Sequence, residues 1–237
     1  MNYKFKNFSI LIPVHNEEKI LFDSMEQIYT FCLNTKLDFE IIFSENGSND
    51  KTIELLNKIS KDKKECKFIS SNKPNYGKAL KDGLIESNNE LVVIFDVDYF
   101  SENFLKECLT LDNEYSAIIG SKRLADSNDN RGFSRVLISS IYALILKIIF
   151  GTKLSDTHGM KAFRKSAYIN ILKKIKSDQW MFDTELLLRI ERSGQKIKET
   201  PVIVNEIRPS VYNISFDIPK TLFLILKLRV KLLLEND

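Results

Sequence analysis

Short apolar runs alternate with helical patterns along the first half of this chain, and this order strongly limits its fold. Strand-like runs occupy residues 8–13, 39–43, 66–69 and 91–95, and apolar residues recur at helical spacing after each of the first three. The order β-α-β-α-β-α-β favours a mostly parallel sheet with right-handed crossovers. Ligands of such sheets bind at the carboxyl ends of the strands. The pattern therefore predicts an α/β fold with a site along one sheet edge.

Composition excludes several classes of protein. The 237 residues are 43% hydrophobic and 28% charged, which suits one large α/β domain or one domain with appendages. The net charge of +3 comes from 35 basic and 32 acidic residues, so the charge balance does not indicate nucleic-acid binding. Three cysteines without a Cys-x-x-Cys spacing, together with only two histidines, do not indicate a zinc site. An odd number of widely spaced cysteines fits a reduced cytoplasmic setting best.

The pair Asp96 and Asp98 is the strongest candidate for chemistry. The two carboxylates directly follow the apolar residues 91–95, so they are expected at the carboxyl end of a buried strand. Burying two unpaired carboxylates is costly, but a divalent cation with oxygen ligands removes the repulsion and can bridge to a diphosphate. The pair therefore indicates transfer from a nucleotide-linked donor with Mg²⁺ or Mn²⁺. The alternative is a strand that simply ends in an acidic turn.

Three further polar loops are predicted at the same edge, at residues 13–17, 44–50 and 72–78. Residues 46–50 have the composition of a tight turn that enters a helix, whose backbone N–H groups could hold a ligand. Residues 75–78 combine a glycine with Lys78 at a helix start, and this lysine could bind phosphate or remain solvated. Together with the acidic pair, these loops could hold a base, a ribose and a diphosphate.

The segments 8–17, 44–52, 75–78 and 96–98 resemble, in this order, the family 2 glycosyltransferases of GT-A fold. The segments 120–123, 156–164 and 182–185 are similar to the branch related to dolichyl-phosphate mannosyltransferase, which moves sugars onto polyprenyl phosphates. The resemblance implies a Rossmann-like, mostly parallel sheet flanked by helices, with a C-terminal helical region on the acceptor side.

The resemblance also implies roles for individual residues. The donor nucleotide would be bound by Pro13, His15, Asn16, Glu17, Glu45, Asn46, Asn75, Gly77, Lys78 and Asp96. The acceptor phosphate would be bound by Arg123, Arg131, Ser134, Arg135 and Arg208. The metal would be held by Asp96 and Asp98, and the catalytic candidates are Asp98, Arg123 and Glu185.

Three positions depart from the family pattern. Glu45 and Asn46 stand where the family commonly has two aspartates, which affects the expected selectivity for the base. Phe100 stands where close relatives often have a glutamine that completes the metal shell, so weaker metal binding or a water ligand is expected. His158 stands where relatives often have Ser or Gln, and it could donate a hydrogen bond to phosphate or fill space.

A phosphate acceptor changes what the enzyme needs, because its oxygen is already ionised near pH 7, whereas a sugar hydroxyl must lose a proton to a base. The predicted reaction is an inverting transfer of a hexose from a GDP- or UDP-linked sugar to a polyprenyl, dolichyl-type phosphate, with arginine forks holding the acceptor. One alternative is transfer to a glycan hydroxyl with Asp183 or Glu185 as base. Another is a catalytically silent homologue that binds nucleotide or a membrane partner as a scaffold.

The predicted organisation has three parts. Residues 1–125 form the half of a GT-A domain that binds nucleotide sugar, residues 126–212 form its acceptor half, and residues 213–237 form a C-terminal helix. The apolar stretches 136–150 and 222–234 contain polar residues and fall short of the roughly 20 apolar residues of a spanning helix, so neither is expected to cross a bilayer.

The last helix is expected at a membrane surface. Lys220, Lys227 and Lys231 share one narrow sector of it, which suits an anionic membrane. Packing on the catalytic domain or on a membrane-embedded partner subunit is the alternative. The predicted location is peripheral, on the cytoplasmic face of a membrane, with no nucleic-acid partner.

Overall fold

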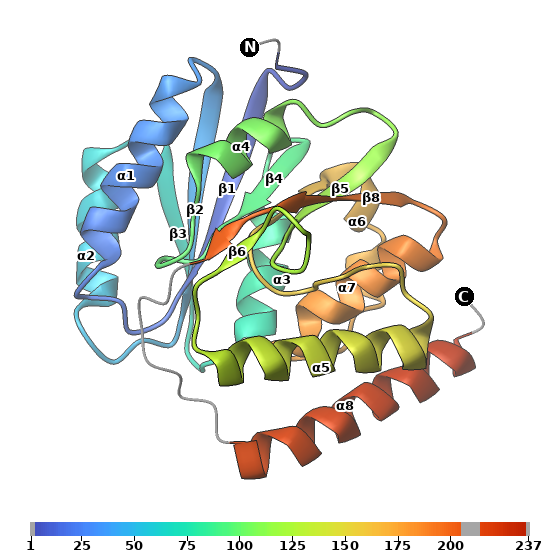
Figure 1. Cartoon of the computed structure of the whole chain (residues 1–237). Coiled ribbons are helices and arrows are strands. Elements are labelled where there is room, and N and C mark those ends of the chain that lie inside the picture. The colour runs from blue at the N-terminus through green and yellow to red at the C-terminus, as the bar shows by residue number, and fades with distance from the viewer. Residues whose placement is uncertain (1–2, 205–213, 236–237) are drawn as a thin grey trace.

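A seven-stranded sheet in the order β3-β2-β1-β4-β7-β5-β8 forms the centre of the protein (Figure 1). The computed structural model describes residues 3–204 and 214–235. The strands β1 (Asn7–Val14), β2 (Asp38–Asn46), β3 (Cys66–Ser71) and β4 (Leu91–Ile94) pair in parallel. This arrangement confirms the predicted α/β fold with a mostly parallel sheet.

Each face of the sheet carries its own core because successive strand residues point to opposite sides. Ile10 and Ile12 pack with the helices α1 (Leu21–Asn34) and α2 (Thr52–Asp62) on one face, whereas Leu11 packs with α3 (Tyr76–Glu86) on the other. Gly83 lets α3 approach this strand, because a Cβ at this position would lie 2.2 Å from Cδ1 of Leu11. Burial on both faces explains the continuous apolar runs of the parallel strands.

The second half of the chain completes the sheet in a less regular way. The strand β5 (Tyr115–Ser121) follows α4 (Glu102–Leu109), and β8 (Lys196–Pro201) pairs with it in parallel. The four-residue strand β7 (Lys161–Arg164) lies between β4 and β5 and is antiparallel to both. The elements β6 (Asn128–Asp129), β9 (Ile203–Val204), α6 (Lys165–Tyr168) and a 3-10 turn (Ile171–Lys173) are short. The division of the chain into a donor half, an acceptor half and a C-terminal helix, at residues 125 and 212, stays a prediction.

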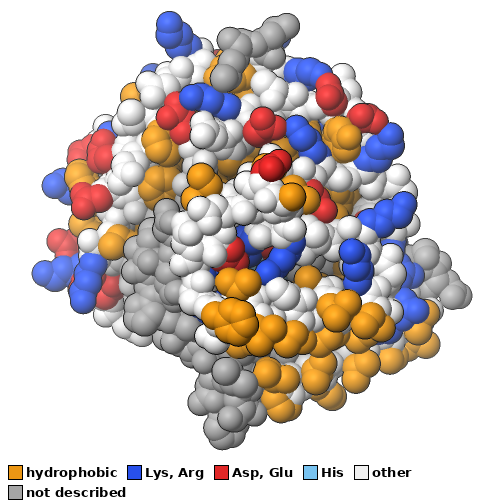
Figure 2. All heavy atoms as spheres, viewed as in Figure 1, with side chains coloured by type: hydrophobic (Ala, Val, Ile, Leu, Met, Phe, Trp, Pro, Cys, Tyr) orange, Lys and Arg blue, Asp and Glu red, His pale blue; other side chains and the backbone are white. Residues whose placement is uncertain are grey.

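Three helices pack together in the second half of the chain: α5 (Phe133–Phe150), α7 (Met181–Arg192) and α8 (Ile214–Leu234). Figure 1 shows α5 and α8 side by side, and apolar side chains of all three helices pack together, among them Leu146, Leu188 and Ile225. The outward sides of α5 and α8 are apolar as well, and Figure 2 shows them as a continuous band of hydrophobic side chains.

The helix α5 corrects one expectation. It is the helix in the described part of the chain that is long and apolar enough to cross a membrane, with a mean hydropathy of 1.9 over 18 residues. Residues 136–150 were expected to fall short, but the helix begins earlier, at Phe133, and only 6% of its residues are buried. Length and composition alone do not decide whether it spans a bilayer or lies on one.

Candidate active site

Asp96 and Asp98 lie in a tight turn directly after β4. The backbone N–H of Asp96 donates to the carbonyl of Tyr99 over 3.2 Å, and the N–H of Tyr99 donates to the carbonyl of Asp96 over 3.1 Å. Burial raises the pKa of Asp96 to about 6; Lys161 opposes this shift, while Asp183 and Asp98 add to it. The turn therefore brings the predicted pair into a group of carboxylates that favours a proton or a cation.

A buried ion pair adjoins this turn. Lys161 begins β7 beside Ile94 of β4, and its Nζ lies 2.9 Å from Oδ2 of Asp183 on α7. Both side chains are only 2% exposed, and Oδ1 of Asp183 accepts no hydrogen bond from any described residue. The hydroxyl of Tyr76 lies near both Asp183 and Asp96, and burial together with these carboxylates raises its pKa well above the usual value. Four separate elements thus meet at the end of β4.

The donor atoms at this end of the sheet fit a hard divalent cation. Asp96, Asp98 and Asp183 bring three carboxylates together near Lys161 and Lys122, and Lys122 is itself paired with Asp156, so negative charge is in excess. No group of three or more His, Cys, Asp or Glu side chains with metal-binding geometry occurs among the residues the structure describes. A cation on the aspartates of the turn would therefore need oxygens from a diphosphate and water, as Mg²⁺ sites commonly do.

Phe100, which stands where close relatives often have glutamine, is an apolar side chain without an atom that can bind a metal ion. Its ring lies 6.5 Å from that of Phe95 and 6.0 Å from that of Phe31, within the core on one sheet face. The position has therefore become part of the apolar packing.

The loops after β1, β2 and β3 are joined by hydrogen bonds. Nδ1 of His15 lies 2.8 Å from the carbonyl of Asn46, and the N–H of Asn75 donates to Oδ1 of Asn46 over 2.5 Å. Oδ1 of Asn16 accepts from the N–H of Asn49 over 2.8 Å. Asn16 adopts a φ of 56°, a left-handed conformation that asparagine tolerates better than most residues. The structure therefore brings these predicted site residues together at one edge.

Other predicted residues of these loops support the loops themselves. Glu45 is buried, and its carboxylate accepts from the N–H of Ser48 over 2.5 Å and from the hydroxyl of Ser70. Pro13 is a buried residue of β1, and the N–H of Glu17 donates to the hydroxyl of Thr52. Glu45 therefore stabilises the turn after β2 in this conformation.

The start of α3 is built for close packing. Asn75 caps the helix by accepting from the N–H of Lys78 over 3.0 Å, and the ammonium of Lys78 pairs with Asp82. A Cβ at Gly77 would lie 2.9 Å from the backbone of Gln179, so only glycine fits beneath the loop that precedes α7. Binding of a phosphate by Lys78 would require the lysine to leave Asp82.

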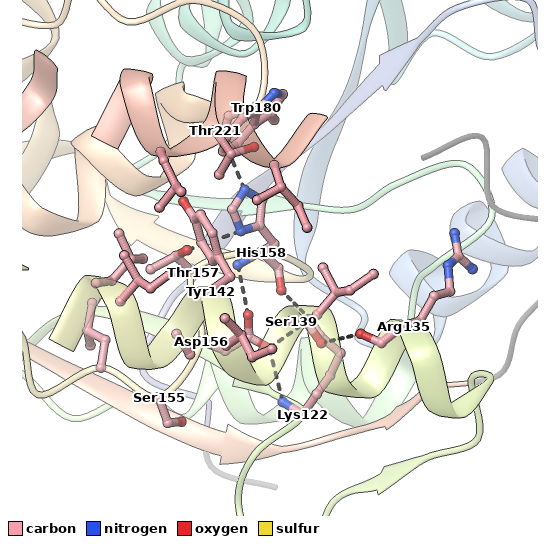
Figure 3. A pocket seen from close by; sticks show the side chains of 18 of the residues that line it. Lys122, Arg135, Ser139, Tyr142, Ser155, Asp156, Thr157, His158, Trp180 and Thr221 are labelled. Carbon is pink, nitrogen blue, oxygen red and sulfur yellow. Dashed lines mark hydrogen bonds and ion pairs between the residues drawn. The ribbon is translucent and has the colours of Figure 1, made fainter. Parts of the chain in front are cut away.

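A cavity of about 520 Å³ lies beside this site, between α5, the start of α8 and residues 154–158 (Figure 3). Its polar part is lined by Lys122, Arg131, Arg135 and Asp156. Its apolar part is lined by side chains that include Ile138, Ile141, Ile145, Leu146, Leu154 and Leu222. Because Ile141 and Leu222 are also exposed, the apolar part reaches the outer band of Figure 2. The cavity therefore suits a ligand with an anionic head and an apolar tail.

Two cations of the cavity are already paired with carboxylates. Nζ of Lys122 lies 2.7 Å from Oδ2 of Asp156, and Arg131 makes a bidentate contact with Asp129 at 2.6 and 2.7 Å. The pKa of Asp156 is lowered despite its burial, chiefly by the nearby Lys122. A phosphate that enters the cavity would compete with these carboxylates for the same donors.

The remaining predicted phosphate ligands occupy different places. Arg135 lines the cavity, whereas Arg123 lies against α5 and donates to the hydroxyl of Ser140 over 2.6 Å and to the carbonyl of Val136 over 3.1 Å. Ser134 is exposed, and Arg208 lies outside the described residues. Arg123 therefore holds α5 in this conformation and would need to turn to reach a phosphate in the cavity.

His158 is enclosed by two aromatic rings that the sequence did not point to. The ring centroids of Tyr142 and Trp180 lie 5.3 Å and 6.1 Å from that of His158 (Figure 3). Nδ1 of His158 lies 3.1 Å from the hydroxyl of Thr157, and Nε2 lies 3.2 Å from the carbonyl of Trp180. Burial lowers the pKa of His158, so the ring is neutral near pH 7. It joins the loop 154–158 to α5 and α7.

Glu185 lies on the other side of α7 from Asp183, since residues two apart on a helix do not share a face. It is fully buried, and Oε1 lies 2.8 Å from Nη2 of Arg189 and also contacts the ammonium of Lys231 on α8. These partners lower its pKa against the effect of burial. The carboxylate of this segment that faces Asp96 is thus that of Asp183. Lys231, expected in the membrane-facing sector, instead anchors α8 to α7.

Comparisons with known proteins agree with this geometry. The family model described as Glycosyl transferase family 2 matches residues 9–172. Glycosyltransferase AglD of Haloferax volcanii is 26% identical over 202 residues, covering 82% of this chain and 32% of that protein. Dolichyl-phosphate beta-glucosyltransferase ALG5D of Trichomonas vaginalis is 28% identical over 227 residues, covering 87% and 68%. An undecaprenyl-phosphate 4-deoxy-4-formamido-L-arabinose transferase of Pectobacterium atrosepticum is 28% identical, covering 68% and 49%. The chain thus spans between 32% and 68% of the length of these relatives.

Solved structures share the fold. Glucosyl-3-phosphoglycerate synthase from Mycobacterium tuberculosis, in complex with Mn²⁺, UDP and phosphoglyceric acid, superimposes with a TM-score of 0.64 at 18% identity, covering 93% of this chain and 78% of that one. A mannosyltransferase from Pyrobaculum calidifontis in complex with GDP-mannose and Mn²⁺ gives a TM-score of 0.59, also at 18% identity, covering 89% and 59%. The sheet, the loops along its edge and the matched family model together show that this chain belongs to glycosyl transferase family 2 and has the GT-A fold.

Proposed function

We propose that this chain is a metal-dependent, inverting glycosyltransferase that moves a hexose from a UDP- or GDP-linked sugar to a polyprenyl phosphate. The observation that carries the proposal is the cavity between α5 and α8, which has cations at one part and an apolar wall that reaches an exposed apolar face. A soluble glycan would not bury so much apolar surface. The relatives named for dolichyl and undecaprenyl phosphates support the same acceptor class.

The donor would bind along the loops after β1 to β4. Asp96 and Asp98 would hold a Mg²⁺ or Mn²⁺ ion, which when bound supplies positive charge for the departing diphosphate. His15, Asn16 and Asn46 would surround the nucleoside, because their hydrogen bonds bring three loops to one place. The two structural relatives that contain Mn²⁺ with UDP or GDP-mannose support a donor of this kind.

The acceptor phosphate would bind at the polar part of the cavity. Lys122, Arg131 and Arg135 line this part, and a phosphate monoester with two negative charges would bind them in place of Asp156 and Asp129. The phosphate oxygen needs no deprotonation before it attacks the anomeric carbon. The protein's task is then to hold both substrates in line and to exclude water.

The apolar band of Figure 2 would lie in the interfacial layer of a cytoplasmic membrane face. On α5 it consists of Phe133, Leu137, Ile141, Leu144 and Ile148, and on α8 it includes Phe223, Leu226, Val230 and Leu233. Exposed apolar surface of this extent is rare on a protein that stays in water. The exposed Lys220 and Lys227 flank the band and could reach lipid headgroups.

Transfer to a glycan hydroxyl is the second candidate, because Oδ1 of Asp183 has no hydrogen-bond donor among the described residues and could act as a base. One assay separates the candidates. Purified protein is mixed with radiolabelled UDP- and GDP-sugars, Mn²⁺ and vesicles that contain dolichyl or undecaprenyl phosphate, and the product is extracted into organic solvent.

The proposal expects a lipid-soluble product that disappears in Asp98→Ala, with unchanged circular dichroism of the variant. Label in a soluble glycan alone would instead identify the hydroxyl-directed enzyme. If titration shows no binding of UDP or GDP with or without Mn²⁺, the protein is a scaffold rather than an enzyme.

A further inference from the structure

The hydroxyl of Tyr99 is buried and makes no hydrogen bond to any residue that the structure describes. A buried hydroxyl without a partner destabilises a fold by about 1–3 kcal/mol, so native proteins rarely contain one without a reason. A phenylalanine would fill the same space without this cost. The hydroxyl would gain a partner when a ligand that carries an acceptor atom enters and displaces the side chains that cover it.

Tyr99 ends the acidic turn and lies beside Lys122, a cation of the polar part of the cavity. Two backbone hydrogen bonds tie it to Asp96. On its other side, a Cβ built on Gly159 would lie 3.4 Å from Cε1 of Tyr99 and 3.2 Å from Nζ of Lys122, so the ring and this ammonium flank the same glycine. Tyr99 is thus the residue that follows the predicted metal pair and also adjoins a cation of the cavity.

The charges around the hydroxyl define what it can bind. Three carboxylates, those of Asp156, Asp96 and Asp129, and one guanidinium, that of Arg131, act on Tyr99. A phenol hydroxyl is protonated near pH 7, so it can donate a hydrogen bond. Its natural acceptor is an anionic oxygen held by the neighbouring cations, because hydrogen bonds from a hydroxyl to an ionised oxygen are short and strong.

We propose that the hydroxyl of Tyr99 donates a hydrogen bond to a phosphate oxygen of a bound substrate, at the junction of the donor site and the cavity. This inference rests on the proposed function and adds a catalytic residue to it. The phosphate is either the monoester of the acceptor or the diphosphate of the donor, and the two sources are separated by experiment.

The test compares Tyr99→Phe with a matched control, Tyr168→Phe. The hydroxyl of Tyr168 is also buried, but it donates to the carbonyl of Leu84 over 3.0 Å, in the core on the far side of the sheet. Tyr168→Phe should lower the melting temperature and leave kcat/KM unchanged. Tyr99→Phe should keep or raise the melting temperature and reduce kcat/KM by about 10- to 100-fold, the range for a hydrogen bond to a charged group.

Two measurements identify the phosphate. A higher KM for polyprenyl phosphate with unchanged affinity for UDP or GDP in the presence of Mn²⁺ assigns the acceptor phosphate. Weaker nucleoside diphosphate binding in a titration assigns the donor. The inference is overturned if Tyr99→Phe has wild-type values of kcat, KM and nucleotide affinity, or if it loses as much stability as Tyr168→Phe.

Failure of the proposed function has a different result. The wild-type protein would then transfer no sugar to any polyprenyl phosphate. In that case, direct binding of UDP, GDP and dolichyl phosphate to the wild type and to Tyr99→Phe still decides the inference, since equal affinities for all three overturn it.

Discussion

Replacement of Lys161 by methionine should be among the most destabilising single changes in this protein. Nζ of Lys161 lies 2.9 Å from Asp183, and both side chains are 2% exposed, so the variant leaves a carboxylate buried beside Asp96 without its counter-charge. Breaking such a pair from one side typically costs about 3–5 kcal/mol. For a domain of this size, 1 kcal/mol shifts the melting temperature by about 2–4 °C, so a loss of ~10 °C is expected.

Asp183→Asn, which removes the other partner of the pair, should lower the stability less than Lys161→Met does. Asp183→Asn leaves Lys161 with Asp96 as a neighbouring anion, so the ammonium keeps a counter-charge. In the double variant Lys161→Met/Asp183→Leu, apolar packing replaces the pair, and the stability should recover much of the loss of Lys161→Met because no charge remains unpaired. The coupling between the two sites should exceed ~1 kcal/mol.

Urea unfolding measures this cycle directly. Trp180 is the only tryptophan of the sequence and directly precedes α7, so its fluorescence reports unfolding next to the pair. The slopes of the unfolding curves should agree between variants, which shows that only stability has changed. Strictly additive losses, or a Lys161→Met variant as stable as the wild type, would refute the reasoning.

Two further predictions concern the donor site and α8. The pKa of Asp96 is about 6, and a cation binds only the charged form of this carboxylate, so protons compete with the cation below pH 6. The affinity for Mn²⁺ in the presence of UDP or GDP should therefore be constant above about pH 7. Well below pH 6 it should fall by up to about tenfold per pH unit. Calorimetric titration between pH 5 and 8 measures this, and a flat profile would contradict it. Lys231→Met should weaken the attachment of α8 to α7, because it removes the ammonium that contacts Glu185. The expected results are faster hydrogen exchange in α8 and a higher KM for polyprenyl phosphate, with an unchanged affinity for the nucleotide. The exposed Lys227→Met is the control, and equal exchange in both variants would count against the anchor.

The first four strands of the sheet were predictable because the sequence features that mark them lie within each strand and the loop after it. Strands buried on both faces require continuous apolar runs, and the loops at their carboxyl ends are polar. Residues 8–13 and 91–95 could therefore be recognised as strands without knowledge of the strands that pair with them. The start of α1 at Leu21 was less predictable, because residues 17–20 form a turn in which the carbonyl of Glu17 accepts from the N–H of Leu21. Such boundaries depend on single hydrogen bonds.

The antiparallel strand β7 was not predictable because its burial depends on distant segments. The strand β7 begins with a lysine, and Lys161 is buried only because Asp183 arrives from a helix some twenty residues later. The cavity was equally hidden, since α5 and α8 form its walls from separate parts of the chain. Spacing alone places Asp183 and Glu185 on different sides of a helix, but only tertiary packing decides which side meets Asp96.

Under the proposed function, the pairing of Lys122 with Asp156 and of Arg131 with Asp129 would make the acceptor site selective for the charge of its ligand. A chloride ion or a singly charged headgroup has too little negative charge to replace the carboxylates that already pair with both cations. A phosphate monoester carries about two negative charges and several oxygens, so it can engage both cations at once. We therefore expect this site to discriminate against phosphodiester lipids, whose phosphate carries a single negative charge, and to bind a lipid whose phosphate is terminal.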